Sequence, residues 1–578
     1  MRFLPIAIAL AILGHAPDSV AAWQPQGDPL GDGFRPQEAA ALLSDGAHGA
    51  FVVRVPSVLP GPDGLHAHRV TSAGEAWPGW PDSGVAFASN LINFVQDVSV
   101  CSDGAGGLFV AWTGQTAQRV SNTFVTRITQ DGTFAPGWTR DGRQVGNGPG
   151  FDRYPRVVPD GSGGAIVVWT RFAEPPAYPI VALRLTATGS TAPAWPDTGV
   201  WLSAKPELKF LNALVPDGSG GAIAAWLGQR IGLQRVTAAG TIAPGWAADG
   251  IPAGNGPDTQ GYPWLAPAFD GGAFVGWNDA RNTVADPRSA PFLLRITGDA
   301  SIAGGWPTDG LGIPNPLGFI GDLIADGSGG VYLAWSGAIG LPSSPRAVRI
   351  SRVTGAGSPS PGWPATGVRA TTLASPAEAS PRLALLSDGA VLETWASGGG
   401  VPDIYAQRIG SGGVVDPGWP PNGVGVCTTV ESQNYPFVAD GGGRAGFVAW
   451  ADERGGSGSG DVFIQRLDAT GLPGSTVDVA PGRGPERLRL SMPRPNPGGA
   501  RVAVDLSLPF DATVSATMLD VRGRIVRQLL RGAWLPAGRQ ALTWDGRDDE
   551  GRETPAGIYF FEVRSSSGVA VARVARVR

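Results

Sequence analysis

The sequence has few of the residues that bind metals or cross-link chains: 578 residues include two cysteines and four histidines. Cys101 and Cys427 lie far apart, so a framework of several disulfides is excluded and both are expected to be small buried side chains rather than a bridge. A repeated Cys/His zinc motif is excluded by the same shortage. His66 and His68 would share one face of a strand, but two ligands make only a fragment of a metal site, and we expect them to pack as ordinary side chains.

Lysine is almost absent, and the charge is unevenly distributed. Lys205 and Lys209 are the only lysines, and the formal net charge is −5. Residues 486–578 contain 15 arginines and 10 acids, which gives that segment +5 and leaves about −10 for the rest. The acidic first part argues against a nucleic-acid partner. The change of sign follows the Gly/Pro-rich stretch 481–485, which we interpret as a linker between domains.

Long apolar runs are also missing after the N-terminus. Met1, Arg2 and Phe3 precede the apolar segment LPIAIALAIL at 4–13, and small residues follow at 20–22. This arrangement predicts a secretory signal peptide over 1–22 and Trp23 as the first mature residue. No later run approaches about 18 residues, so no transmembrane span is predicted. We therefore expect an exported protein.

Motifs for covalent or phosphate chemistry are absent as well. The sequence has no G-x-S-x-G, no plausible Cys–His pair and no P-loop. Its Gly-rich DGSGG segments precede apolar strands, so no helix N-terminus is available to hold a phosphate. The acidic segment WDGRDDEG at 544–551 is suited at most to weak calcium binding, and we expect a surface turn there and no cofactor.

Two repeated phrases dominate what is present. The inner phrase is Asp-Gly, small residues and an apolar run that ends in Trp; its eight copies start 52 to 62 residues apart. These copies lie at 45–54, 103–112, 160–169, 217–226, 270–277, 326–335, 388–395 and 440–450. The outer phrase is a Trp, three residues and a Gly, and it begins at Trp23, Trp80, Trp138, Trp195, Trp246, Trp306, Trp363 and Trp419. A fixed period of this length predicts a repeat architecture of four short strands per unit.

Eight such units, each burying its faces against its neighbours, predict an all-β fold with an eight-bladed β-propeller over 23–480. Seven blades is the alternative if the first copy, which has Arg54 in place of Trp, forms no blade. The N-terminus has an outer phrase without preceding strands, whereas the last copy lacks an outer phrase. We therefore expect the N-terminal strand to complete the last blade, which leaves no exposed sheet edge.

The repeated residues are expected to be scaffold. The two phrases account for 15 of the 20 tryptophans, and a residue present in every unit serves packing more often than ligand binding. An arginine of the third strand recurs in the same way. It is found at Arg69, Arg127, Arg184, Arg235, Arg295, Arg352, Arg408 and Arg466.

The last segment carries a resemblance to known domains. Its features are PNP at 495–497, VAVDLSL at 502–508, LDVRGRIVRQL at 519–529, WDGRDDEG, PAGIYFFEV at 555–563 and a terminal VARVARVR. Residues 486–578 resemble the C-terminal sorting domains of type IX secretion and the immunoglobulin-like domain of flagellar hook-capping proteins. The resemblance implies a small β-sandwich that engages the outer-membrane secretion machinery and places the protein at the cell surface or outside. Alternating short strands agree with an immunoglobulin-like sandwich.

The repeats resemble secreted bacterial propellers that carry a W-x-D-x-R … DIYAQR phrase, here WNDAR at 277–281, WADER at 450–454 and DIYAQR at 403–408. That resemblance implies export without an assigned reaction. The Asp-Gly hairpin also resembles the Asp-box of sialidase propellers, although the spacing and the preceding Ser/Thr differ. Asp452 and Glu453 are a candidate acid pair for another glycosidase.

We interpret the chain as a surface or extracellular binding or adhesion protein, with a propeller glycosidase or a purely structural protein as alternatives. Propellers bind ligands with variable loops and the central funnel. Tyr154, Tyr262 and Tyr435 each precede a proline at the expected start of an innermost strand, and Trp264 lies nearby. These four aromatic residues are our candidate site for a glycan or protein ligand.

Overall fold

The computed structural model contains strands and no helices in its described part, residues 23–577 with gaps. The gaps are 31–36, 57–63, 90–94, 116–119, 147–149, 173–177, 257–259, 269, 282–289, 315–317, 339–345, 373–377, 399, 455–459, 474–487, 491–492, 494–501, 509–511, 536–537 and 566–567. The predicted signal peptide and linker lie outside the described residues. Within them, no helix is long and apolar enough to cross a membrane.

Residues 28–467 form eight four-stranded antiparallel sheets in the described part, numbered here as blades 1 to 8. The first strands of neighbouring blades contact one another all the way round, so they surround a central channel. These innermost strands are β2 (Gln37–Ser44), β6 (Val95–Ser102), β10 (Phe151–Pro159), β14 (Phe210–Pro216), β18 (Trp264–Pro267), β22 (Gly318–Ala325), β26 (Glu378–Leu385) and β30 (Gln433–Asp440). The chain is a β-propeller, as predicted.

The other three strands of each blade follow outward. The second strands hold the apolar run of the inner phrase; they are β3 (Ala50–Pro56), β7 (Leu108–Gln115), β11 (Ala165–Phe172), β15 (Ala222–Leu227), β19 (Ala273–Asp279), β23 (Val331–Ala338), β27 (Val391–Ser397) and β31 (Gly446–Asp452). The third strands are β4 (Leu65–Val70), β8 (Ser121–Ile128), β12 (Ile180–Leu185), β16 (Ile231–Val236), β20 (Ala290–Ile296), β24 (Arg346–Val353), β28 (Asp403–Ile409) and β32 (Asp461–Leu467). The outer strands are β5 (Val85–Phe87), β9 (Arg143–Gln144), β13 (Val200–Ser203), β17 (Ile251–Pro252), β21 (Leu311–Gly312), β25 (Val368–Arg369), β29 (Val424–Cys427) and β1 (Asp28–Pro29).

The two repeated phrases meet inside six of the eight blades. The Gly that ends each outer phrase has a positive φ, and in these six blades it lies against the buried indole of the inner phrase. A Cβ on Gly142 would overlap Trp112, and one on Gly310 would overlap Trp277. Glycine is therefore needed there for its backbone conformation and for the space that it leaves to the indole.

The remaining repeated residues join each blade to the next. The inner-phrase aspartate accepts hydrogen bonds from its own turn, as at Asp160, and pairs with the repeated arginine, Arg184 Nε to Asp160 Oδ2 at 2.9 Å. Arg184 Nη1 also donates to the Ala238 carbonyl of blade 4 at 2.9 Å, and the outer-phrase Trp195 donates its Nε1–H to the same carbonyl at 2.9 Å. The same shared acceptor recurs in five further blades, at the carbonyls of Gln130, Ala187, Gly298, Gly355 and Ser411. The repeated Trp and Arg side chains are scaffold, as predicted.

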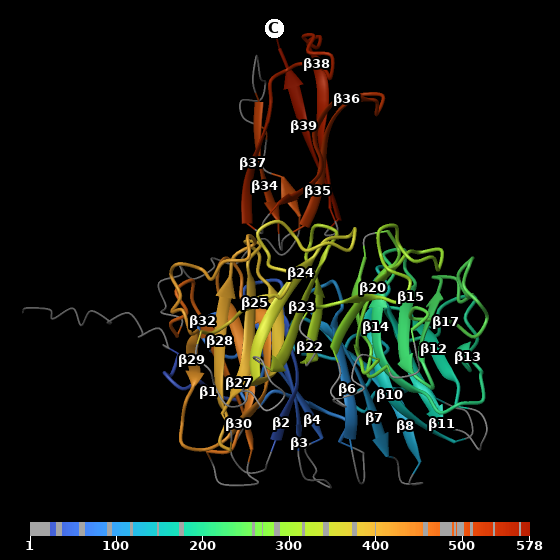
Figure 1. Ribbon diagram of the computed structural model, residues 1–578. Coiled ribbons are helices and arrows are strands. Elements are labelled where there is room, and N and C mark those ends of the chain that lie inside the picture. The colour runs from blue at the N-terminus through green and yellow to red at the C-terminus, as the bar shows by residue number, and fades with distance from the viewer. Residues whose placement is uncertain are drawn as a thin grey trace, which may run out of the picture.

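The N-terminal strand closes the ring. In blade 8, β1 pairs with β32 through Asp28 opposite Ile464, and Figure 1 shows it in blue among the orange strands. Gly27 packs on the Trp450 indole of that blade, and Trp23 donates its Nε1–H to the Ser72 carbonyl of blade 1 at 2.9 Å. Our expectation of closure by the N-terminal strand is confirmed.

Blade 1 has its four strands although Arg54 replaces the inner-phrase Trp. Arg54 Nε donates to His68 Nε2 at 2.8 Å, and Arg54 Nη2 donates to the Ser83 carbonyl at 3.1 Å. Burial and the charge of Arg54 lower the pKa of His68 to about 3, so the imidazole is neutral and accepts this bond. The buried Arg54–His68 pair thus occupies the place of the indole, and His68 has a packing role, as expected.

The C-terminal segment forms a β-sandwich of two sheets. One contains β33 (Arg489–Leu490), β34 (Val502–Leu508) and β37 (Gly538–Trp544); the other contains β36 (Ile525–Leu535), β35 (Ala512–Asp520), β38 (Gly557–Ser565) and β39 (Gly568–Arg576). Their facing side chains make one apolar core around Trp544, Met518 and Phe561. Trp544 packs against Tyr559 with ring centroids 5.0 Å apart and donates its Nε1–H to the Arg547 carbonyl at 2.8 Å.

Candidate functional site

One position in each innermost strand is not repeated. It lies opposite the residue that precedes the inner-phrase Trp, or Arg54 in blade 1. We call these eight residues the channel ring: Ala41, Ser99, Arg156, Ala213, Trp264, Asp322, Arg382 and Phe437. The scaffold residues recur from blade to blade, whereas the ring contains six residue types that differ in size, charge and polarity. Variation at one structural position on a constant framework is typical of a binding site.

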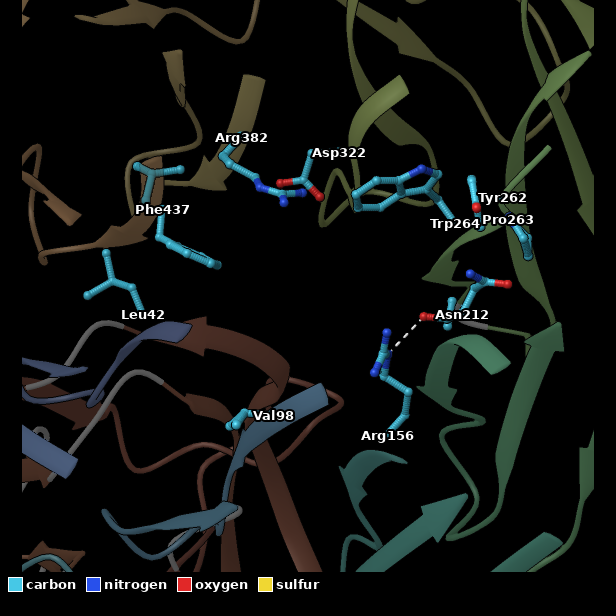
Figure 2. A pocket seen from close by; sticks show the side chains of 12 residues that line it. Leu42, Val98, Arg156, Asn212, Tyr262, Pro263, Trp264, Asp322, Arg382 and Phe437 are labelled. Carbon is cyan, nitrogen blue, oxygen red and sulfur yellow. Dashed lines mark hydrogen bonds between the residues drawn. The ribbon is translucent and has the colours of Figure 1, made fainter. Parts of the chain in front are cut away.

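Six ring residues line a cavity of about 500 Å³ in the central channel (Figure 2). Leu42, Val98, Asn212, Tyr262, Pro263 and Val438 complete its lining. All eight innermost strands therefore contribute at least one residue to the lining of the cavity. Its volume is within the range of about 300–1,000 Å³ that is usual for small-ligand sites.

Bulges in the innermost strands aim the ring residues. Seven of the eight first-to-second strand pairings contain a register shift immediately before the ring position, and β18 is the exception. In four of them a non-glycine residue has a φ between 52° and 58°, at Asp97, Tyr154, Ser380 and Tyr435. A bulge of this kind inserts an extra residue and redirects the side chains that follow.

Arg382 contacts two aromatic rings of the cavity and a backbone carbonyl of the neighbouring blade. Its guanidinium carbon lies 5.4 Å from the centroid of the Trp264 ring and 5.7 Å from that of Phe437. Its Nη1 donates to the Gly321 carbonyl of blade 6 at 2.6 Å. Figure 2 shows it entering from the side opposite Trp264, with Asp322 between them. The carbonyl bond and the two rings hold a positive charge beside an aromatic surface.

Asp322 is oriented by backbone amides. Its Oδ1 accepts from the Leu323 N–H and its Oδ2 from the Leu383 N–H, both at 2.9 Å. Burial raises its pKa above the ordinary aspartate value, while the charge of Arg382 and these two amides act in the opposite sense. Asp322 and Arg382 form no ion pair with any described residue. The carboxyl is therefore fixed by the blade 6–blade 7 junction rather than by the guanidinium.

Arg156 supplies a second cation from blade 3. Its Nε donates to the Asn212 carbonyl and its Nη1 to the Pro155 carbonyl, both at 2.9 Å (Figure 2). Burial lowers its pKa, and the charge of Asp97 compensates only in part. The cavity thus holds two guanidinium groups, one carboxyl group and the Asn212 amide on a wall that is otherwise aromatic and aliphatic.

The structure separates the four aromatic residues proposed from the sequence. Trp264 and Tyr262 line the cavity, and Tyr262 is 63% exposed. Tyr154 is half-buried and packs against Phe172 and Phe210, with ring centroids 6.2 and 5.6 Å apart. Tyr435 is 62% exposed and does not line the cavity.

Sequence reasoning missed the charged part of the lining, Arg156, Asp322 and Arg382, and also Phe437. The signal was available: aligning the eight copies on the inner-phrase Trp places all four in one column. That column contains six different residue types, whereas the column after it is Leu or Val in all eight copies.

Of the two acids singled out for glycosidase chemistry, Asp452 has scaffold contacts, which removes the pair as a catalytic unit. Asp452 has no exposed surface, accepts the Trp450 Nε1–H at 2.9 Å and pairs with Arg454. Arg454 in turn donates to the Gln26 carbonyl of the closing segment at 2.9 Å. The W-x-D-x-R phrase therefore joins an inner Trp to the outer edge of its own blade. Asp279 and Arg281 form the same ion pair in blade 5.

The acidic turn of the sandwich and the cysteines also have local roles. In WDGRDDEG, Asp548 accepts from the Arg552 and Glu550 amides and pairs with Arg552. Among the described residues, no group of three or more His, Cys, Asp or Glu side chains is placed to hold a metal. Cys101 and Cys427 are both free thiols, half-buried and buried respectively.

Comparisons with known proteins concern the two parts separately. Residues 494–568 match the FlgD Ig-like domain family. The basal-body rod modification protein FlgD of Salmonella typhimurium is 35% identical over 111 residues, which are 18% of this chain and 44% of that protein. FlgD of Salmonella typhi matches to the same extent. The chain thus spans less than half the length of these curated relatives.

Solved structures resemble the chain at low identity. An ulvan lyase has a TM-score of 0.40 at 11% identity, over 66% of this chain and 94% of that one. A lectin of Burkholderia pseudomallei has a TM-score of 0.38 at 12% identity, over 66% and 99%. A Hadza microbial sialidase has a TM-score of 0.32 at 13% identity, over 71% and 75%. The family match over residues 494–568 confirms the resemblance of the tail to the immunoglobulin-like domain of hook-capping proteins, for the C-terminal module alone.

Proposed function

We propose that this chain is an exported, surface or extracellular binding protein whose ligand site is the central channel of the propeller. The observation that carries the proposal is the channel ring, where a constant scaffold presents different residues into one cavity. Trp264, Arg382 and Phe437 bring an aromatic surface and a charge together there. Binding sites of this kind combine an apolar wall with a few placed polar groups.

Binding is favoured over hydrolysis by the inventory of the cavity. Glycosidases of the common types use two carboxyl groups on either side of the scissile bond. Among the described lining residues Asp322 is the one acid, and its oxygens already accept two backbone amides. The lining is therefore better suited to binding a ligand than to cleaving it.

The C-terminal module is proposed to direct sorting across the outer membrane, through contact with the secretion machinery. Its support is the match to an immunoglobulin-like domain together with the ordered motifs quoted from the sequence. The signal peptide proposed at 1–22 would supply the first export step. The site and the module make a protein that binds its ligand outside the cell.

A glycan panel probed with the mature protein, residues 23–578, tests the binding proposal. Wild type should bind at least one group of glycans, and Trp264→Ala should reduce the affinity at least tenfold because it removes the aromatic wall. Trp201→Ala is the matched control, since Trp201 is 52% exposed on the outer strand β13. Absence of binding by wild type, or equal loss in both variants, would overturn the channel as the ligand site.

A further inference from the structure

The charges of the cavity do not balance within the described protein. Arg156 and Arg382 contribute two guanidinium groups, and Asp322 contributes the one carboxyl group of the lining. Neither arginine forms an ion pair with a described carboxylate. The repeated scaffold arginines behave differently, because each of seven is paired with its inner-phrase aspartate. Cations placed in a cavity without such partners are costly unless something else compensates them.

Both channel guanidiniums keep donors for a ligand. Arg156 uses Nε and Nη1 on backbone carbonyls, and Arg382 uses Nη1 in the same way. These bonds fix the direction of each planar group while leaving its Nη2 without a hydrogen bond to a described residue. A guanidinium held in this manner suits an anionic oxygen, which can accept one or two N–H groups in its plane. Asp322 does not take that role, because its oxygens accept backbone amides instead.

Aromatic side chains form the part of the cavity wall that surrounds Arg382. The Trp264 and Phe437 rings lie on either side of the Arg382 guanidinium, and Tyr262 continues the surface to the rim. Flat ring faces of this kind pack against the C–H face of a sugar ring. The cavity thus offers two separate contacts: anion to guanidinium, and ring face to ring face.

We propose that the ligand is an acidic saccharide whose carboxylate or sulfate groups are held by Arg156 and by Arg382, each from its own side of the channel, while a sugar ring packs on Trp264. This inference rests on the proposed binding function and specifies its ligand class. The volume of about 500 Å³ admits a small part of a saccharide chain, so recognition is of a terminal or local segment. An acidic peptide would meet the cations equally well but would leave the aromatic wall without a matching flat partner.

The test compares oligogalacturonate with its carboxyl-reduced, neutral counterpart, with affinities measured calorimetrically on residues 23–578. Wild type should bind the acidic probe at least tenfold more tightly than the neutral one. Added salt should lower the affinity for the acidic probe and leave that for the neutral probe unchanged. Arg156→Gln and Arg382→Gln should each remove most of that preference. Arg140→Gln is the control, because Arg140 is exposed outside the channel. Arg382→Lys keeps the charge and serves if loss of the Gly321 bond prevents folding, which thermal melting reports.

The outcomes separate the inference from the proposed function. Equal affinity for both probes, unaffected by the arginine variants but lost in Trp264→Ala, would overturn the acidic ligand while keeping the channel as a saccharide site. No binding of either probe, together with an empty glycan panel, would overturn both. Tighter binding of an oligoglutamate peptide than of oligogalacturonate would overturn the saccharide part.

Discussion

Replacing Glu393 by valine should stabilise the propeller. Glu393 lies on β27 at 0% exposure, and neither of its carboxyl oxygens has a hydrogen-bond partner among the residues that the structure describes. The equivalent residue, two before the inner-phrase Trp or Arg54, is apolar in the other seven blades. These residues are Val52, Val110, Val167, Ala224, Val275, Leu333 and Val448. Blade 7 thus buries a carboxyl group where its neighbours bury an aliphatic side chain.

The size of the gain follows from opposing terms. An unpartnered buried polar group costs about 1–3 kcal/mol, which the valine variant recovers. The smaller side chain leaves a gap worth about 1 kcal/mol. We therefore expect a net stabilisation of about 0–2 kcal/mol at pH 5, since the raised pKa favours the neutral carboxyl in the folded state.

The stability gained by Glu393→Val relative to wild type should increase with pH. Burial raises the pKa of Glu393 well above its ordinary value of 4.5, and the neighbouring carboxyl of Glu378 raises it further. The folded protein therefore retains a proton that the unfolded chain releases above about pH 4.5, so wild type loses stability as the pH rises. Burial also raises the pKa of Glu378, to about 7, but Glu378 is present in both proteins. The variant lacks only the contribution of Glu393.

Denaturant unfolding of wild type and variants at pH 5 and pH 8 measures both effects. Glu393→Gln is the control, because glutamine keeps an unpartnered polar group but cannot ionise. It should gain little at pH 5 and remove only the pH-dependent difference. A valine variant less stable than wild type at both pH values would show that the carboxyl stabilises the junction, and the reasoning would be refuted.

Deleting residues 23–30 should expose an edge of blade 8 and cause aggregation or a large fall in melting temperature; unchanged cooperative melting would contradict closure by β1. Trp169→Ala should lower the free energy of unfolding by about 3–5 kcal/mol, since Trp169 is fully buried. Trp264→Ala should lower it far less, because Trp264 is only partly buried. Equal losses in the two variants would contradict the division between scaffold and candidate site. Removing residues 482–578 should leave the propeller folded, as judged by its melting curve, but should retain the protein in the periplasm of its host. Efficient appearance of that truncated protein outside the cell would reduce the sandwich to a structural module.

The blades could be predicted from the sequence because each repeated residue has its partner at a fixed separation. Asp160 and Arg184 meet within one blade, and Trp195 reaches a carbonyl of the next, so the same spacing had to recur in every unit. The ends of the propeller were equally informative. Each lacked the part that the other supplied, and β1 joins them.

Only part of the candidate site in the channel could be predicted from the sequence. Tyr262 and Trp264 belong to an aromatic cluster that stands out in the sequence, and both line the cavity. Arg156 and Arg382 were not found because bulges shift the inward register, and simple alternation along a strand does not survive an inserted residue. The packing of Tyr154 depends on Phe210 of the next blade, a contact that no local pattern contains.

The pairing of β1 with β32 sets an order for assembly. Its flanking contact, from Arg454 to Gln26, spans 428 residues, whereas the bonds between successive blades span about 50. Contacts between neighbouring blades can therefore form one after another along a growing chain, but the seam cannot form before the last blade exists. If the chain emerges N-terminus first, β1 has no pairing strand until blade 8 has folded. Until then the incomplete propeller has two unpaired sheet edges, one at β1 and one at β32. A chaperone that bound the unpaired β1 would be released when β1 pairs with β32.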